Sequence, residues 1–191
     1  LSTQYRRQAY GVLESEHTFE VFGHLTQQQR SFWALPADVR SPDFIERIEL
    51  GIVAGTSFHR LFVSGELFMD VSDTDGGTAI ELEAGRATAI TDRLSLTPIV
   101  GIRWGSRDYI KRYFGASDEL RQQFDAFNSH GGFFEYFAEA GIEYRFAQSW
   151  SFKSSVRYAH LLGSASRSPF VERAQGSQGQ VSAFTALIWL F

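Results

Sequence analysis

The chain has 191 residues, of which 43% are hydrophobic, 15% aromatic and 21% charged, and its net charge is −4. This length suits one domain, and the composition excludes a disordered chain. The absence of a basic block argues against nucleic-acid binding. The sequence has no cysteine, which excludes a disulfide scaffold and a thiolate metal site.

Alternation of apolar and polar residues is the dominant pattern along the chain, and it predicts a set of β-strands. In chain order they cover residues 1–9, 17–25, 44–55, 60–71, 78–90, 94–105, 133–146, 150–162 and 180–191. The patterns at 1–9, 17–25 and 78–90 are weaker than the others. No apolar run approaches the roughly 18 residues of a transmembrane helix.

The predicted strands are longer than the strands of most soluble proteins. Several run to about a dozen residues, whereas soluble strands usually have about 5–6 and a tilted membrane-spanning strand needs roughly 9–11. In residues 133–146, the apolar face starts at Phe134 and Tyr136, and charged residues occupy the opposite face. Alternation with apolar residues outside and polar residues inside is typical of transmembrane barrels.

The predicted connections alternate in length. Residues 56–59, 91–93 and 147–149 form tight connections, and long polar loops span 26–43, 106–132 and 163–179. Bacterial outer-membrane barrels have short periplasmic turns and long extracellular loops, so this pattern places the C-terminus in the periplasm.

We therefore expect an all-β fold, a transmembrane antiparallel up-and-down β-barrel that occupies residues 1–191 as a single domain. Bacterial barrels normally have an even number of strands. We therefore predict about ten strands, with nine visible in this chain and an N-terminal strand preceding Leu1. A soluble β-sandwich or lipocalin-like barrel would also alternate, but it explains neither the strand length nor the terminal aromatic residue.

Two residues conflict with this pattern. Arg86 falls on the apolar face of 78–90, where a bulge near Gly85 or a position close to the lipid headgroups would accommodate it. Pro98 lacks an amide hydrogen inside a predicted strand.

The inward-facing positions predict a charge network in the lumen. Its central members are Glu66, Arg103, Glu135, Glu139, Glu143, Arg145, Lys153 and Arg157, within a wider set that adds Arg47, Glu49, Asp70, Glu81 and Glu83. A barrel of roughly eight to ten strands has little space beyond its own side chains, and buried charges must pair. The favoured interpretation is a salt-bridged plug. A narrow charge-selective pore is the alternative, and catalytic paired carboxylates come third.

Catalytic and metal-binding motifs are absent from the sequence. Neither HExxH spacing nor a local nucleophile motif occurs. His130 and His160 fall near the predicted outer rim, where an outer-membrane hydrolase would have its site. We expect no catalytic residue, no metal and no cofactor.

Two terminal and loop features carry further predictions. Leu187, Trp189 and Phe191 alternate at the C-terminus, as in a signal read by the barrel insertion machinery. Loop 106–132 is rich in aromatic residues and predicts a short helix across the barrel mouth, with Ser117 as its N-cap. The helix would be either a packed lid or a surface for a partner.

Several motifs resemble those of the MipA/OmpV family, the MltA-interacting proteins. Residues 92–98 are similar to a strand opening of the family, and Tyr113, Phe114 and Gly115 begin a segment similar to its YFGVS loop motif. Residues 161–171 resemble its LLGDAADSPIV segment, which would make Gly163, Ser168 and Pro169 part of an extracellular loop motif. Ser164 and Arg167 stand where the family usually has aspartates.

The resemblance implies an outer-membrane protein that acts as a scaffold, linking a lytic transglycosylase to a penicillin-binding synthase. We therefore expect a non-enzymatic structural or scaffolding protein. Its expected partners are outer-membrane lipid, the barrel insertion machinery, and murein-remodelling enzymes or another membrane complex. A narrow channel for small solutes is the alternative function, and an outer-membrane enzyme is the third.

Overall fold

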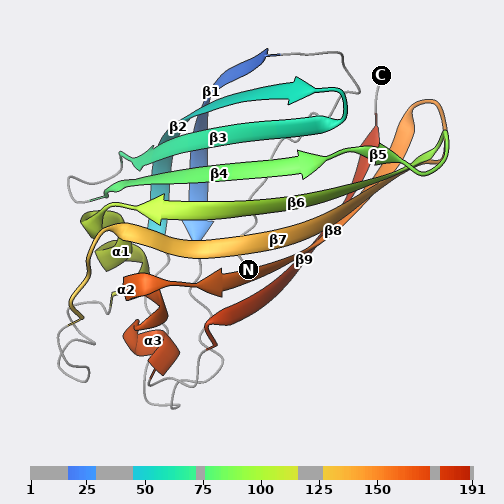
Figure 1. The fold of residues 1–191 in the computed structure, drawn as a ribbon. Helices are drawn as coiled ribbons and strands as arrows, with labels where there is room; N and C mark the ends of the chain where they lie inside the picture. The colour runs from blue at the N-terminus through green and yellow to red at the C-terminus, as the bar shows by residue number, and fades with distance from the viewer. Residues whose placement is uncertain (1–16, 29–44, 72–75, 116–126, 173–176, 190–191) are drawn as a thin grey trace.

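The computed structural model describes residues 17–28, 45–71, 76–115, 127–172 and 177–189. These residues form one antiparallel sheet, with three short helices at one of its ends (Figure 1). The strands are β1 (His17–Gln28), β2 (Ile45–Phe58), β3 (Leu61–Asp70), β4 (Thr78–Arg86), β5 (Thr88–Ala89), β6 (Leu94–Gly105), β7 (Gly132–Arg145), β8 (Trp150–Leu161) and β9 (Gly179–Trp189).

Each long strand pairs with the next long strand along the chain. The hydrogen-bonded order is β1-β2-β3-β4-β6-β7-β8-β9, and the short β5 pairs with β6. Figure 1 shows this sheet strongly curled, with β1 and β2 bending behind the central strands. Within the described ranges β1 and β9 are the two ends of the order. The expected all-β fold with antiparallel up-and-down neighbours is confirmed.

The three helices lie together where the long connections were expected. They are α1 (Arg107–Phe114) after β6, and α2 (Gly163–Ser166) and α3 (Pro169–Glu172) after β8. The connections at the opposite end of the sheet are short, as between β2 and β3 and between β7 and β8. No helix in the described part of the chain is both long and apolar enough to span a membrane.

Most predicted strands agree with the observed bounds to within a few residues. The predicted strand at 1–9 lies outside the described residues. The predicted strand 78–90 is divided into β4 and β5. Gly85 pairs with Ile99 and Thr88 pairs with Leu96 in one continuous register, so the break lies opposite Pro98. Because Pro98 has no amide hydrogen, the ladder cannot be continuous at this point.

The bulge that we expected near Gly85 is therefore absent, since the register does not shift there. Arg86 is instead the last residue of β4, and its side chain is exposed beside the short turns. The end of the strand removes the need for a bulge.

Phe134 was predicted on the outer apolar face, and this prediction is wrong. The register between β6 and β7 shifts at Arg103 and Trp104, which pair with Glu135 and Phe133. Phe134 is the extra residue of this bulge, so its side chain turns away from the outer face. It is 2% exposed and packs in an apolar cluster under the helices.

Within loop 106–132 the described residues form a helix at its start, α1. Ser106 is the N-cap of α1, and its Oγ accepts hydrogen bonds from the amides of Tyr109 at 3.2 Å and Thr78 at 3.0 Å. Ser117, the predicted cap, lies outside the described residues. The Ser106 hydroxyl thus satisfies one helix amide and also ties α1 to the start of β4.

Large rings on the concave face cover glycines of the neighbouring strands. Phe137 pairs directly with Gly101, and a Cβ added to Gly101 would lie 2.3 Å from the Phe137 ring and 2.8 Å from the Leu82 carbonyl. Phe62 covers Gly85 in the same way. These contacts let rings fill the concave side of the curled sheet.

We predict that Gly101→Ala lowers the free energy of unfolding by about 1–3 kcal/mol, since the added methyl group collides with a ring that cannot retreat. The measurement is a urea titration followed by tryptophan fluorescence. Gly141→Ala is the matched control, because its Cβ would meet its nearest atoms at 3.7 Å and 3.8 Å. Equal unfolding midpoints for the two variants would contradict the packing argument.

Candidate functional site

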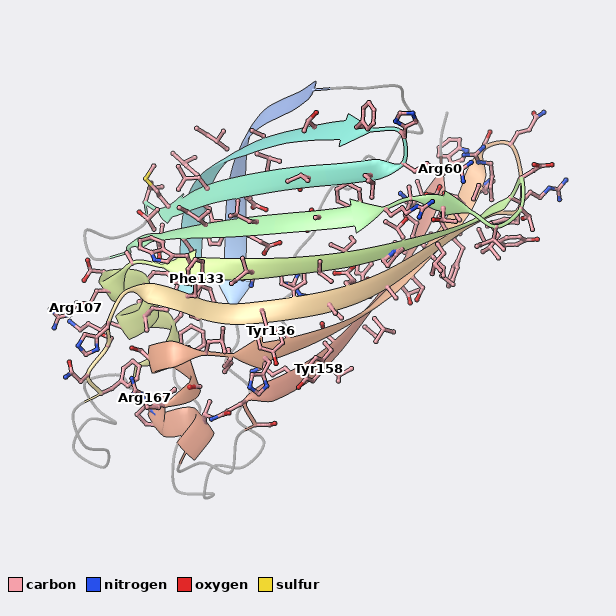
Figure 2. All side chains as sticks on the ribbon, in the orientation of Figure 1. Arg60, Arg107, Phe133, Tyr136, Tyr158 and Arg167 are labelled. Carbon is pink, nitrogen blue, oxygen red and sulfur yellow. The ribbon has the colours of Figure 1, made fainter. Side chains whose placement is uncertain are left out.

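The two faces of the curled sheet have opposite polarity. On the outer face, large apolar side chains are exposed on every long strand whose side chains are described, including Leu50, Val63, Leu82, Val100, Tyr136, Val156 and Leu187. Figure 2 shows two of these exposed side chains, Tyr136 on β7 and Tyr158 on the neighbouring β8. Charged side chains are buried on the concave face, where Glu81 is 1% and Glu135 8% exposed. A soluble protein has the reverse distribution.

Five charged residues meet at the centre of the concave face. We call this group the central ionic cluster, and its members are Glu81, Arg103, Glu135, Glu139 and Arg157. They come from four strands, β4, β6, β7 and β8. The antiparallel register places Glu81 beside Arg103, Arg103 beside Glu135, and Glu139 beside Arg157.

Arg103 joins the two most buried acids of this cluster. Its Nε donates a hydrogen bond to Glu81 Oε2, and its Nη1 lies 3.6 Å from Glu135 Oε1. The Glu81 side chain is 1% exposed, so almost no water reaches it. A carboxylate in such a place retains its charge only when a fixed cation lies beside it.

Arg157 completes the cluster from β8. Its Nη2 lies 3.1 Å from Glu135 Oε1 and 3.8 Å from Glu81 Oε2, and its Nη1 lies 4.0 Å from Glu139 Oε2. The guanidinium carbon also lies 3.4 Å from the centre of the Phe137 ring. Arg157 is therefore fixed by charge on one side and by a cation–π contact on the other.

The remaining predicted network residues are Glu66, Glu143, Arg145 and Lys153, and of these only Glu66 borders the cluster. Glu66 is partly buried directly opposite Glu81 in the ladder. Glu143 and Lys153 form a separate pair at 3.2 Å. Arg145 is exposed at the end of β7, next to the short turns.

Sequence reasoning placed Glu81 only in the wider set and did not single out Phe137. The alternation of the strands predicts that both side chains point to the concave face. Residue 81 shares a face with Glu83, and residue 137 shares a face with Glu135 and Glu139. Arg112, which we treated as part of a loop, also has an inward partner. Its Nε lies 3.2 Å from Asp70 Oδ2, so an ion pair links α1 to the end of β3.

The helices close over an apolar cluster at their end of the sheet. Phe68, Tyr109, Ile110, Phe134 and Leu161 are buried there, with Ala79 and Ala165. The Tyr109 ring stacks on Tyr113 with centroids 3.9 Å apart. The helices are therefore packed against the sheet at this end by a shared apolar cluster.

The two loop motifs meet although they are far apart in the sequence. Ser168 Oγ donates a 2.7 Å hydrogen bond to the carbonyl of Phe114, and Ser168 is 1% exposed. Gly115 ends α1, and a Cβ there would lie 2.2 Å from the Lys111 carbonyl. Gly163 has a φ of 55°, which favours glycine, and Pro169 is the first residue of α3.

The rim histidines do not form a catalytic arrangement with a described nucleophile. His130 and Ser164 line a small cavity of about 220 Å³, but the contact between them is from the His130 backbone amide to Ser164 Oγ at 3.1 Å. His160 Nδ1 lies 3.4 Å from the Tyr158 hydroxyl. Among the described side chains, no three His, Asp or Glu residues are placed to hold a metal ion.

The C-terminal strand exposes the alternate residues that we predicted as an insertion signal. Leu187 is 62% and Trp189 58% exposed, and Trp189 stacks with Trp150 of β8 at 6.1 Å between ring centroids. Phe191 lies outside the described residues.

These features define an all-antiparallel β-protein of inverted polarity, with an ionic interior, an apolar exterior and helices over one end. Within this class, the chain belongs to the MipA family, the MltA-interacting proteins, whose family model matches residues 3–191. The resemblance seen in the loop motifs is thereby confirmed.

Two curated relatives give the same result at lower coverage. The chain is 28% identical over 83 residues to the MltA-interacting protein of Escherichia coli strain K12, and equally to that of Shigella flexneri. Each match covers 42% of this chain and 33% of the relative. The matched segment thus spans about a third of the length of these relatives.

We predict that Arg103→Gln destabilises the fold by about 3–5 kcal/mol, because it leaves the buried carboxyl group of Glu81 without its main partner. Urea titration measures the change. The double variant Glu81→Gln with Arg103→Gln should recover most of the loss, since both charges are then absent.

Lys153→Gln is the matched control, because its ion pair with Glu143 is 24% and 27% exposed and should contribute at most about 1 kcal/mol. If Arg103→Gln cost no more than Lys153→Gln, the central ionic cluster would not be important for stability.

Proposed function

We propose that this protein is a bacterial outer-membrane β-barrel that acts as a non-enzymatic scaffold for a murein-degrading lytic transglycosylase. The inverted polarity of the sheet is the observation that supports a location in the outer membrane. Exposed apolar residues such as Val181 at 72% and Val100 at 61% would be unfavourable in water and favourable in lipid. The long strands have 9 to 14 residues, enough for a tilted span of the hydrocarbon layer.

Closure of the sheet follows from the same environment. An open sheet edge in lipid leaves backbone N–H and C=O groups without partners, at a cost of several kcal/mol each. The strong curl of the sheet supports closure (Figure 1). The proposed barrel has its short turns and C-terminus in the periplasm and its helices at the outer surface, as in other bacterial barrels.

The scaffold role rests on the family. The relatives that match this chain are MltA-interacting proteins, named for an interaction with the lytic transglycosylase MltA. The interior of this chain is compatible with such a role, because its buried charges are engaged with one another. For example, the single residue Arg157 contacts three acids, Glu81, Glu135 and Glu139. A scaffold needs a displayed surface and does not need an acid or base available for chemistry.

A second partner, a penicillin-binding synthase, completes the scaffold that the family resemblance implies. The short periplasmic turns are the proposed surface for both enzymes, because murein lies on that side of the outer membrane. The helices at the other end would then serve as a lid.

We expect the full-length protein to capture a purified lytic transglycosylase in a pull-down. The double variant Glu81→Gln with Arg103→Gln should capture it equally well, because the central ionic cluster is inside the barrel and away from the turns. Absence of capture by the wild type, in a preparation whose heat-modifiable migration shows a folded barrel, would reject the scaffold role.

The central ionic cluster and Phe137 are also expected to block the lumen. In a planar bilayer the full-length protein should give no discrete conductance steps, and Arg157→Gln should remain silent, because the Phe137 ring still fills the centre. Steps that appear in the wild type and change size in Arg157→Gln would favour the alternative function, a narrow channel.

A further inference from the structure

Two pairs of arginines lie at the end of the sheet that carries the short turns. The amide of Ala87 donates a 2.9 Å hydrogen bond to the carbonyl of Arg60, so Arg60 lies opposite Ala87, the residue that follows Arg86. The amide of Arg145 donates a 2.8 Å hydrogen bond to the carbonyl of Arg93. We call Arg60, Arg86, Arg93 and Arg145 the arginine rim. Figure 2 shows Arg60 at the end opposite to Arg107 and Arg167.

The arginine rim differs from the arginines of the interior. Arg103 and Arg157 are buried against carboxylates, whereas all four rim side chains are exposed and form no ion pair within the described residues. The exposed acid in these turns is Asp92, so positive charge is in clear excess. Arg93 and Arg145 lie directly opposite each other, where like charges repel, and a bound anion would relieve that repulsion.

The arginine rim borders exposed aromatic and apolar surface. Phe58 is 65%, Leu61 57% and Trp189 58% exposed at this end. Arg86 pairs with Leu61 in the ladder and lies on the same apolar face. An anion that reaches Arg86 must therefore lie against apolar surface. A phospholipid has this combination, because its phosphate group lies directly above its acyl chains.

We propose that the arginine rim binds the phosphate groups of anionic glycerophospholipids in the membrane leaflet on the side of the short turns. This inference rests on the proposed function, because it requires the apolar face to be in lipid. It also gives Arg86 a role, since an arginine on the apolar face is favourable when its guanidinium reaches the headgroups. The opposite end has mixed charge, with exposed Asp108 next to Arg107.

The test uses the full-length protein in mixed micelles of a neutral detergent with either phosphatidylglycerol or phosphatidylcholine. Native mass spectrometry counts the lipid molecules retained. The wild type should retain phosphatidylglycerol in preference to phosphatidylcholine. Arg60→Gln with Arg86→Gln should weaken phosphatidylglycerol binding roughly tenfold, since each basic group near an anionic surface contributes several-fold to binding.

The matched control is Arg107→Gln with Arg167→Gln, which removes two exposed arginines from the helix end and should leave phosphatidylglycerol binding unchanged. Addition of inorganic phosphate should not displace the lipid, because a free ion lacks the acyl chains. Displacement by phosphate would identify a simple anion site and overturn the lipid assignment.

Equal retention of the two lipids by the wild type would also overturn this inference, as would undiminished binding by the Arg60 and Arg86 variant. If that variant kept its lipid preference but lost capture of the lytic transglycosylase, the arginine rim would be a protein-docking surface. A protein that inserts into bilayers without lipid preference refutes only this inference. Failure to insert at all refutes the proposed function as well.

Discussion

The contact between Arg103 and Glu81 is the constraint on which the rest of this structure depends. Glu81 is almost completely buried, so it can exist as a carboxylate only if a cation is fixed beside it. That cation lies on the next strand of the sheet and is shared with Glu135 one strand further. The strands β4, β6, β7 and β8 must therefore keep their register, because a slip of one residue would place every charge of the central ionic cluster on the opposite face.

The same alternation explains the outer face. Every second residue of a strand points to the concave face, which holds charged side chains and aromatic rings. The alternate residues point outward and form an apolar surface that includes Tyr136, Tyr158 and Val181. The two ends of the sheet then differ in kind. One end is closed by α1, α2 and α3 over an apolar cluster, and the Asp70–Arg112 ion pair attaches α1 there. The other end has short turns and the four exposed arginines of the arginine rim.

Much of this fold was predictable because strand formation here depends on a local repeat of two residues. The failures came at positions where one strand depends on another. Phe134 is turned inward by a bulge that only the pairing with β6 creates. The strand predicted across Arg86 is interrupted by Pro98, which belongs to a different segment. Helix α1 was not singled out either, since its cap Ser106 also accepts a hydrogen bond from the amide of Thr78, a residue far away in the sequence. Phe137 was overlooked because its importance comes from covering Gly101 and supporting Arg157.

The sequence by itself determined that the chain forms long antiparallel strands with one apolar and one charged face, because successive side chains of a strand point to opposite sides. It also determined the family, through motifs such as Tyr113-Phe114-Gly115. Only the tertiary structure decided which charges pair, since Arg157 reaches acids of both β7 and β4. It likewise decided that Ser168 binds the carbonyl of Phe114 and that Arg145 lies opposite Arg93. These contacts join residues that are distant in sequence, and their geometry depends on the register and curl of the whole sheet.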